Sequence, residues 1–267
     1  PPSQVRSLEP QPICMENLLY KIPEALRIYR LLNPKINDQD MCTQFVGGCV
    51  RDLILAHEIK DIDLATILEP DQVIDILSKE NIKTNIKAKN FGVVTACINK
   101  HVFEITTLRK DLSPDGRYSK VEFIKDWNLD SQRRDFTINS IYCRFDSQDE
   151  QKILLFDPLN GRQDLLDGKI NFISDAKISI QEDYVRALRY FRFFYMYSKC
   201  DHEPYILDQI FSNKEKIKKL SQNRLNLELK KIILSKTGDK ILNNSDVKNF
   251  FYYIYPNFFE ILNLKNL

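Results

Sequence analysis

The chain has 267 residues, a formal net charge of +2, 28% charged residues and 43% hydrophobic residues. These values fit a folded globular protein and argue against a disordered chain or a globally basic nucleic-acid coat. No apolar run reaches the roughly 18 residues of a membrane-spanning helix, so the sequence excludes such a span. Three histidines far apart in the chain argue against a His-based metal site or a hydrolytic triad.

The first part of the chain alternates helical and strand-like segments. Apolar residues at helical spacing predict a helix over 15–32, and β-branched runs predict strands. The predicted strands are 43–46, 62–65, 92–98, 101–108 and 121–124, and the predicted helices among them are 48–56, 71–80 and 128–132. The two-residue connection Asn99-Lys100 predicts a tight hairpin between the third and fourth of these strands.

From about residue 174 the pattern is helical. The predicted helices are 181–199, 203–218 and 222–235. A mixed sheet with helices followed by an all-α region is an α+β fold. Charge divides in a similar way, with a net of −5 over residues 1–185 and +7 over 186–240. The basic part would suit a polyanion, although from charge alone a lysine-rich solvated helix face is favoured.

The sequence GGCVRD at 47–52 follows a predicted strand and opens a predicted helix. The adjacent Gly47 and Gly48 allow backbone N–H groups to point at an anion, and the helix N-terminus adds partial positive charge. Arg51 would add a charge-assisted contact to a phosphate. The pattern predicts a phosphate-binding turn, and a plain tight turn is the alternative.

Two aspartates, Asp61 and Asp63, begin the next predicted strand. Alternate residues of a strand face the same side about 6.5 Å apart, so the two carboxylates can converge. Such a pair suits Mg²⁺, and two ions would activate a 3′-hydroxyl group and stabilise a leaving pyrophosphate. Glu104, in the strand 101–108, is either a third metal-site acid or an edge-strand charge.

A polar, turn-rich segment at 109–117 is expected to form a mobile flap, and a cluster of arginines, an aspartate and an asparagine follows it. Such groups would be costly to leave unpaired in a core, so ligand contacts are expected. The candidates are Arg109, Arg133 and Arg134 for a triphosphate, and Asp135 and Asn139 for ribose hydroxyl groups.

The helical segment 181–193 carries Glu182, Asp183, Arg186 and Arg189. Asp183 and Arg186 are i, i+3 neighbours on a helix, and Arg189 continues the same side. An aspartate can accept from the exocyclic amine of cytosine or adenine while an arginine donates to the ring edge. The segment therefore has the groups to select a nucleobase without a template, although an ordinary helix salt bridge is the commoner case.

Eight short motifs carry a family resemblance over about residues 43–235. In chain order they are GGCVRD, DID, FEITTLR, DGR, RRDFTINS, FDPLNGRQDL, EDYVRALRYFRF and SQNRLNLE. The set resembles the class II nucleotidyltransferases, which are the tRNA CCA-adding enzymes and the related bacterial poly(A) polymerases. EITTLR, the DGR loop and the VEF run before RRD look most like the CCA-adding branch. SQNRLNLE, at 221–228, looks like the fifth motif, an Arg/Glu pair that stabilises a helix turn.

This resemblance implies an α+β nucleotidyltransferase head with a mixed sheet, followed by an all-α neck and a partial body. The expected parts are a lead-in at 1–40, the head at 41–156, the neck at 157–235 and the start of a truncated body at 236–267. The 157–168 stretch would be the hinge between head and neck. The segment 111–117 would be the flexible loop needed when specificity switches to ATP.

The resemblance also implies roles for the candidate residues. Asp61 and Asp63 would bind the two catalytic Mg²⁺ ions, with Glu104 as a further candidate catalytic acid. Arg134 and Asp135 would contact the phosphate and ribose of the incoming nucleotide. The amino-acid template that chooses CTP and then ATP would consist of Glu182, Asp183 and Arg186.

The activity expected is template-independent addition of CMP and AMP to the tRNA 3′ end, from CTP and ATP. Within the same family, a poly(A) polymerase or an enzyme adding only CC or only A is the alternative. From another class, the alternative is an inactive RNA-binding module, against which retention of the aspartates and of Arg133-Arg134-Asp135 argues. The expected location is the cytoplasm, or the mitochondrion if the source is eukaryotic, and the sequence defines no oligomeric state.

Overall fold

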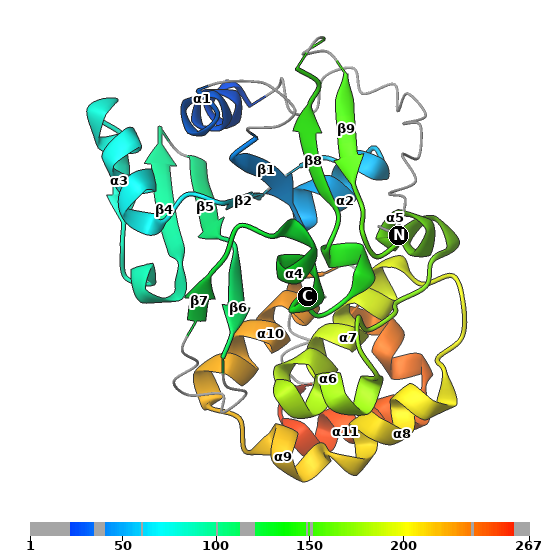
Figure 1. Cartoon of the computed structure of the whole chain (residues 1–267). Coiled ribbons are helices and arrows are strands. Elements are labelled where there is room, and N and C mark those ends of the chain that lie inside the picture. Colours follow the sequence, from blue (N-terminus) through cyan, green and yellow to red (C-terminus); the bar gives the residue numbers. More distant parts are fainter. Residues whose placement is uncertain are drawn as a thin grey trace. The chain divides into compact units, whose positions relative to one another are not determined.

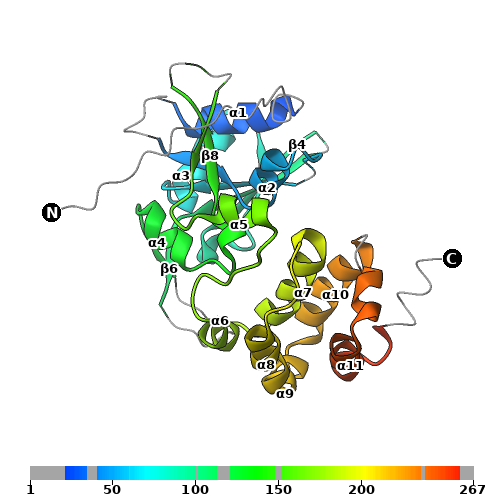
Figure 2. The same cartoon turned by 90° about the vertical axis from the view of Figure 1, so that its right-hand side faces the viewer.

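The structure, a computed structural model, describes residues 22–34, 41–59, 61–99, 101–112, 121–147, 149, 152–235 and 238–258. The chain divides into two compact units (Figures 1 and 2). The first unit comprises Pro1–Leu112, Lys120–Arg133 and Asn139–Arg162, and the second comprises Ser113–Ser119, Arg134–Ile138 and Gln163–Leu267.

A seven-stranded mixed sheet organises the first unit, with the strand order β3-β4-β5-β2-β1-β8-β9. Its strands are β1 (Thr43–Val46), β2 (Ile62–Thr66), β3 (Lys83–Asn85), β4 (Val93–Ile98), β5 (His101–Thr107), β8 (Tyr142–Phe145) and β9 (Ile153–Phe156). Neighbouring strands pair antiparallel except β2 and β5, which are parallel. A separate two-stranded sheet joins β6 (Arg109–Asp111) to β7 (Val121–Phe123).

The two faces of the large sheet differ because successive residues of a strand point to opposite sides. One face packs against α1 (Pro23–Leu32), α2 (Gly48–Ile54) and α3 (Pro70–Lys79), with Leu64 and Phe103 in that core. The other face carries a small apolar cluster that includes Ala65 and Tyr142, beside Trp127 of α4 (Trp127–Gln132). Asp63, which lies between two core-facing residues of β2, therefore points to this second face.

The second unit is helical and has an aromatic core. Its helices are α6 (Ala176–Glu182), α7 (Val185–Tyr197), α8 (Pro204–Ser212), α9 (Lys214–Lys218), α10 (Gln222–Leu234) and α11 (Ser245–Ile254), and α5 (Gly161–Asp167) leads into it. Phe191 of α7 packs against Phe250 and Phe251 of α11. Phe136 pairs with Phe172 in an isolated bridge and stacks its ring edge on Phe193. α7 and α10 lie side by side in both views (Figures 1 and 2).

The α+β expectation is confirmed, and so are the five predicted strands and the helices over 48–56, 71–80 and 128–132. Asn99, at φ 53°, lies in the turn of the predicted β4–β5 hairpin. The predicted helix over 15–32 is confirmed from Pro23 onward, while 15–21 and the expected loop residues 113–117 lie outside the described residues. The functional boundaries expected at 41, 157 and 236 stay predictions.

A single helix over 181–199 is wrong. α6 ends at Glu182, Asp183 is extended at φ −150° and ψ 104°, and α7 begins at Val185. The break is stabilised because Oδ1 of Asp183 accepts a hydrogen bond of 3.1 Å from the Val185 N–H group. The predicted helix 203–218 is likewise divided, at Asn213.

Four strands were not predicted. β3 and β6 are three-residue polar segments without apolar alternation, and the four-residue runs of β8 and β9 are too short to distinguish a strand from a helix. None of the helices in the described part of the chain has both the length and the apolar composition needed to cross a lipid bilayer.

Candidate functional site

The parallel strands β2 and β5 bring acidic side chains to one face of the sheet. Asp61 directly precedes β2, and Asp63 lies within it. Asp63 is in register with Glu104 of β5, so both side chains lie on the face opposite the main core. Asp63 is half-buried, whereas Asp61 and Glu104 are exposed. The structure thus places Asp63 and Glu104 on one side of the sheet, and the convergence of Asp61 with Asp63 stays a prediction.

The glycine turn at 47–48 lies directly beside Asp63. Gly47 precedes α2 with φ 75° and ψ −125°, a conformation that essentially only glycine adopts. A Cβ atom at Gly47 would lie 3.7 Å from Oδ2 of Asp63. Val46 pairs with Asp63 across β1 and β2, so the strand register holds the turn against the carboxylate. The sequence predicted the two motifs separately, and the antiparallel pairing joins them.

The two aspartates at the start of β2 have the chemistry of a Mg²⁺ site. The described residues contain no group of three or more His, Cys, Asp or Glu side chains that could hold a metal ion. Mg²⁺ is bound by one or two carboxylates together with substrate phosphates, so the pair Asp61 and Asp63 fits that ion without a third acid. The role of Glu104 as a third acid stays a prediction.

Arg51 and Asn139, both predicted nucleotide ligands, are in contact with each other. Arg51 is 7% exposed on α2, and its Nη1 donates a hydrogen bond to Oδ1 of Asn139. Asn139 is also buried and ends the 3-10 turn Thr137–Asn139. The contact fixes α2 to a segment 88 residues further along the chain, and the roles of the two residues as ligands stay predictions.

Asp130 contacts two of the predicted phosphate ligands, Arg133 through its side chain and Arg109 through its backbone. This carboxylate is fully buried on α4, and Oδ1 accepts from Nε and Nη2 of Arg133 at 2.8 and 2.7 Å. The same oxygen lies 3.2 Å from the backbone N of Arg109, while Oδ2 accepts from the Tyr142 hydroxyl group at 2.8 Å. Asp130 was not a candidate from sequence, although its i, i+3 spacing to Arg133 on a helix was a usable signal.

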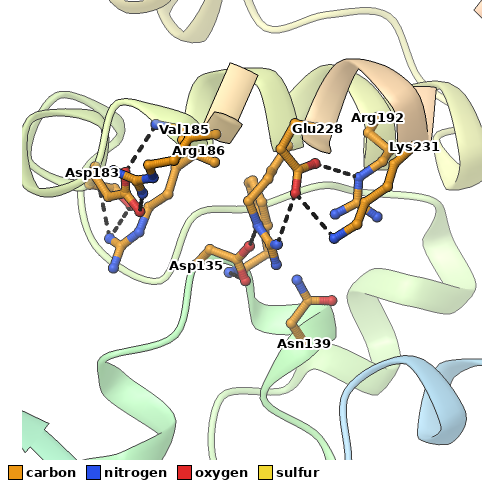
Figure 3. Close-up of polar contacts among 12 residues, drawn as sticks. Asp135, Asn139, Asp183, Val185, Arg186, Arg192, Glu228 and Lys231 are labelled. Atoms are coloured by element: carbon orange, nitrogen blue, oxygen red, sulfur yellow. Dashed lines mark hydrogen bonds and ion pairs between the residues drawn. The ribbon is translucent and has the colours of Figure 1, made fainter. Parts of the chain in front are cut away.

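In the second unit, the buried carboxylates of Asp135 and Glu228 both contact the half-buried Arg189 (Figure 3). Oδ2 of Asp135 lies 2.5 Å from Nε of Arg189, and Nη1 of Arg189 lies 3.5 Å from Oε1 of Glu228. Burial by itself lowers the pKa of Arg189, but the neighbouring Asp135 and Glu228 outweigh it and raise the pKa above its ordinary value. Glu228 also accepts from Nε of Arg192 at 2.9 Å. Arg134, next to Asp135 in the chain, is half-buried.

The predicted i, i+3 neighbours Asp183 and Arg186 have different side-chain partners. Arg186 donates from Nη1 to Oε2 of Glu182 at 2.7 Å and to Oγ of Ser179 at 2.9 Å. Both carboxylate oxygens of Asp183 lie 2.7 Å from Nη2 of Arg224, on α10. The expectation that Asp183 continues a helix with Arg186 is therefore corrected, because Asp183 occupies the link between α6 and α7.

The Arg/Glu pair of the fifth motif makes its ion pairs with other segments, and its role in stabilising a helix turn stays a prediction. Arg224 and Glu228 are four residues apart on α10, yet one contacts Asp183 and the other contacts Arg189 and Arg192. Each side chain therefore joins α10 to another segment.

A mixed sheet on which Asp63 lies against a glycine turn, followed by a helical unit, is the arrangement of a nucleotidyltransferase. Residues 43–171 match the family model described as the Poly A polymerase head domain. This part of the chain belongs to the Poly A polymerase head-domain family, and relatives of the chain are named CCA tRNA nucleotidyltransferase and CCA-adding enzyme. The resemblance inferred from the motifs is thereby confirmed.

Three relatives illustrate the similarity. The chain is 41% identical over 194 residues to CCA tRNA nucleotidyltransferase 1, mitochondrial, of Homo sapiens, covering 72% of this chain and 43% of that protein. It is 31% identical over 235 residues to the CCA-adding enzyme of Staphylococcus aureus (strain MRSA252), covering 87% and 56%. The solved Bacillus stearothermophilus CCA-adding enzyme in complex with CTP aligns with a TM-score of 0.66 and 28% identity, covering 82% and 50%. The chain thus spans about half the length of these relatives.

Proposed function

We propose that this chain adds CMP and AMP to the 3′ end of tRNA without a nucleic-acid template, using CTP and ATP. The names of the Homo sapiens and Staphylococcus aureus relatives support this activity. The solved relative in complex with CTP supports nucleotide binding. The observation that carries the proposal is Asp63 of β2, set against the glycine turn at Gly47 in a head domain of this family.

Mg²⁺ is the proposed cofactor, and Asp61 and Asp63 would hold it. When bound, the ion would supply activation of the attacking 3′-hydroxyl group and stabilisation of the leaving pyrophosphate. The chemistry of the two carboxylates fits this ion, because substrate phosphates complete its oxygen shell. Glu104, in register with Asp63, is the candidate third catalytic carboxylate.

The second unit would select the nucleotide. Glu182 and Asp183 offer acceptors to the exocyclic amine of cytosine or adenine, and Arg186 offers donors to the ring edge. Arg134 and Asp135 would contact the phosphate and the ribose. The further candidate ligands are Gly47, Gly48, Arg51, Arg109, Arg133, Asn139 and Arg189.

We also propose a cytoplasmic location, or a mitochondrial one if the source is eukaryotic. The Homo sapiens and Mus musculus relatives are named as mitochondrial proteins, which supports the second case for a eukaryotic source. Fractionation of the source cells with organelle markers distinguishes the two locations.

The direct test supplies the chain with Mg²⁺ and a tRNA that ends at the discriminator base. Each labelled nucleotide is offered singly, and then CTP and ATP are offered together. We expect addition of C, C and A and no further nucleotides. A tRNA that already ends in CCA is the matched control and should not be extended.

Other outcomes would replace the proposal. A long A tail on unrelated RNA identifies a poly(A) polymerase, and products ending after CC, or A added only to a tRNA ending in CC, identify a split activity. No addition with any nucleotide contradicts the proposal, and RNA binding without transfer would then identify an inactive RNA-binding module.

A further inference from the structure

Helix α10 carries two oppositely charged side chains that reach different carboxylates. Arg224 and Glu228 lie one helical turn apart, at i and i+4. Arg224 binds the carboxylate of Asp183, and Glu228 binds the guanidinium that holds Asp135. Asp183 and Asp135 are the residues proposed to contact the base and the ribose, and α10 reaches the first directly and the second through Arg189.

The contact from Arg224 fixes Asp183 in a defined orientation. Nη2 of Arg224 lies 2.7 Å from both Oδ1 and Oδ2, and the Val185 N–H group donates to Oδ1 at 3.1 Å. An ionised carboxylate has about four acceptor positions, and these contacts occupy about three of them. One position is left for an exocyclic amine, and its direction is set by Arg224.

The contact from Glu228 acts on Asp135 through Arg189. The guanidinium of Arg189 lies between two carboxylates, with Nε toward Asp135 and Nη1 toward Glu228. Glu228 is nearly buried, and it is held from the other side by Arg192 at 2.9 Å (Figure 3). Removing one partner of such a buried ionic group leaves the others without a counter-charge, so Arg189 would lose its defined position.

We propose that Arg224 and Glu228 of α10 are two positioning residues with separate effects. Arg224 orients Asp183 and so determines base selection, whereas Glu228 orients Asp135 through Arg189 and so determines sugar selection. The inference rests on the proposed function, because it assumes that Asp183 contacts the base and Asp135 the ribose. Neither side chain needs to touch the nucleotide. Each fixes a carboxylate that does, and the two sets of contacts run to different segments of the second unit.

The test measures equilibrium binding of four nucleotides to the whole chain by calorimetry. The affinity ratio of CTP to UTP reports base selection, because only cytosine offers an exocyclic amine to Asp183. The affinity ratio of ATP to 2′-deoxy-ATP reports the ribose contact of Asp135. A general loss of structure would lower all four affinities together, whereas loss of one positioning residue changes one ratio.

The variants are Arg224→Gln and Glu228→Gln, with Lys231→Gln as the matched control. Lys231 contacts the same Glu228 carboxylate at 3.4 Å, but 55% of its side chain is exposed to solvent. We expect Arg224→Gln to lower the CTP/UTP ratio about tenfold, as for loss of a charge-assisted hydrogen bond, and to keep the sugar ratio. We expect Glu228→Gln to lower the ATP/2′-deoxy-ATP ratio by a similar factor and to keep the base ratio. Lys231→Gln should change neither.

Other results overturn the inference. If both ratios fall together in both variants, or if neither ratio changes, α10 has no separable roles. If Glu228→Gln does not fold, Arg192→Gln decides the sugar side, because it removes the guanidinium that holds the Glu228 carboxylate at 2.9 Å. An unchanged sugar ratio in that variant contradicts the proposal. Wild-type protein that binds no nucleotide contradicts the proposed function itself, which is a different failure from variants that select as the wild type does.

Discussion

The buried carboxylate of Asp130 lies 2.7 Å from Nη2 of Arg133, on the same face of α4. Arg133 was expected to bind a triphosphate, but its guanidinium is held by an acid that belongs to the interior of the first unit. Asp130 also accepts from Tyr142 in β8 and from the backbone of Arg109 in β6. The pair therefore connects α4 to both sheets of that unit.

We predict that Asp130→Asn lowers the free energy of unfolding by about 3 kcal/mol, because it leaves the Arg133 guanidinium without its buried counter-charge. Urea denaturation followed by circular dichroism measures the change. Tyr142→Phe removes only one hydrogen bond to the same carboxylate, so it should cost about 1.5 kcal/mol. An Asp130→Asn protein as stable as the wild type would show that the ion pair does not anchor α4.

Gly47 and Gly48 form a matched pair for a test of backbone strain. Gly47 has φ 75° and ψ −125°, so Gly47→Ala should destabilise the protein by about 1–3 kcal/mol. Gly48 starts α2, and an added Cβ would meet Nη2 of Arg51 at an ordinary 3.7 Å. Gly48→Ala should therefore change stability by about 0.5 kcal/mol, in the stabilising direction. Denaturation midpoints of the two variants test this, and equal losses would contradict the assigned turn.

We predict that Asp61→Asn and Asp63→Asn each reduce nucleotide transfer about a thousandfold, because a bound metal stabilises the transition state by several kcal/mol. Mn²⁺ titration followed by electron paramagnetic resonance gives a second measurement, in which both variants should bind the ion more weakly. Asp75→Asn, an exposed acid of α3, is the control and should leave both measurements unchanged. Wild-type Mn²⁺ affinity in both variants would refute the metal assignment.

His202 is expected to make the stability of the second unit depend on pH. Its ring stacks on Phe194 at 3.5 Å between centroids, and its nitrogens lie 3.1 Å from the Tyr190 hydroxyl and 3.2 Å from the Tyr195 hydroxyl. Burial lowers the pKa of His202 to about 4, and Asp201 only partly opposes it.

Because the ordinary pKa is 6.5, the unfolded chain binds more protons than the folded chain between pH 6.5 and about 4. The free energy of unfolding should therefore fall as the pH is lowered through this window. The ring is only half-buried, so solvent screening reduces the expected loss to about 1 kcal/mol. Thermal melts at several pH values, compared with His202→Gln, measure the effect. The same slope in both proteins would show that another group is responsible.

Local patterns were sufficient where a residue's position depends on its neighbours in the chain. β1, β2, β4 and β5 were predictable because β-branched and apolar runs alternate with polar residues, and the hairpin because two residues join its strands. The turn at Gly47 was predictable because two adjacent glycines separate a predicted strand from a predicted helix. The break at Asp183 was not, because it depends on the contact with Arg224, 41 residues away.

The candidate residues were also predictable as a set, but their partners were not. Every arginine of the motifs could bind a phosphate, and the sequence does not distinguish that role from a buried ion pair. Arg51 contacts Asn139, Arg133 contacts Asp130, and Arg189 contacts Asp135 and Glu228. The burial of Asp130 and Glu228 decides these pairings.

The sequence by itself determined the α+β class, the family and the position of Asp63 within a strand, because strand alternation and motif order are properties of short segments. Only the tertiary structure decided that α10 contacts Asp183 through the cationic Arg224, and Asp135 through the anionic Glu228 and its partner Arg189. Those contacts join segments 36 to 54 residues apart, and a buried charge takes whichever partner the folded chain brings within reach.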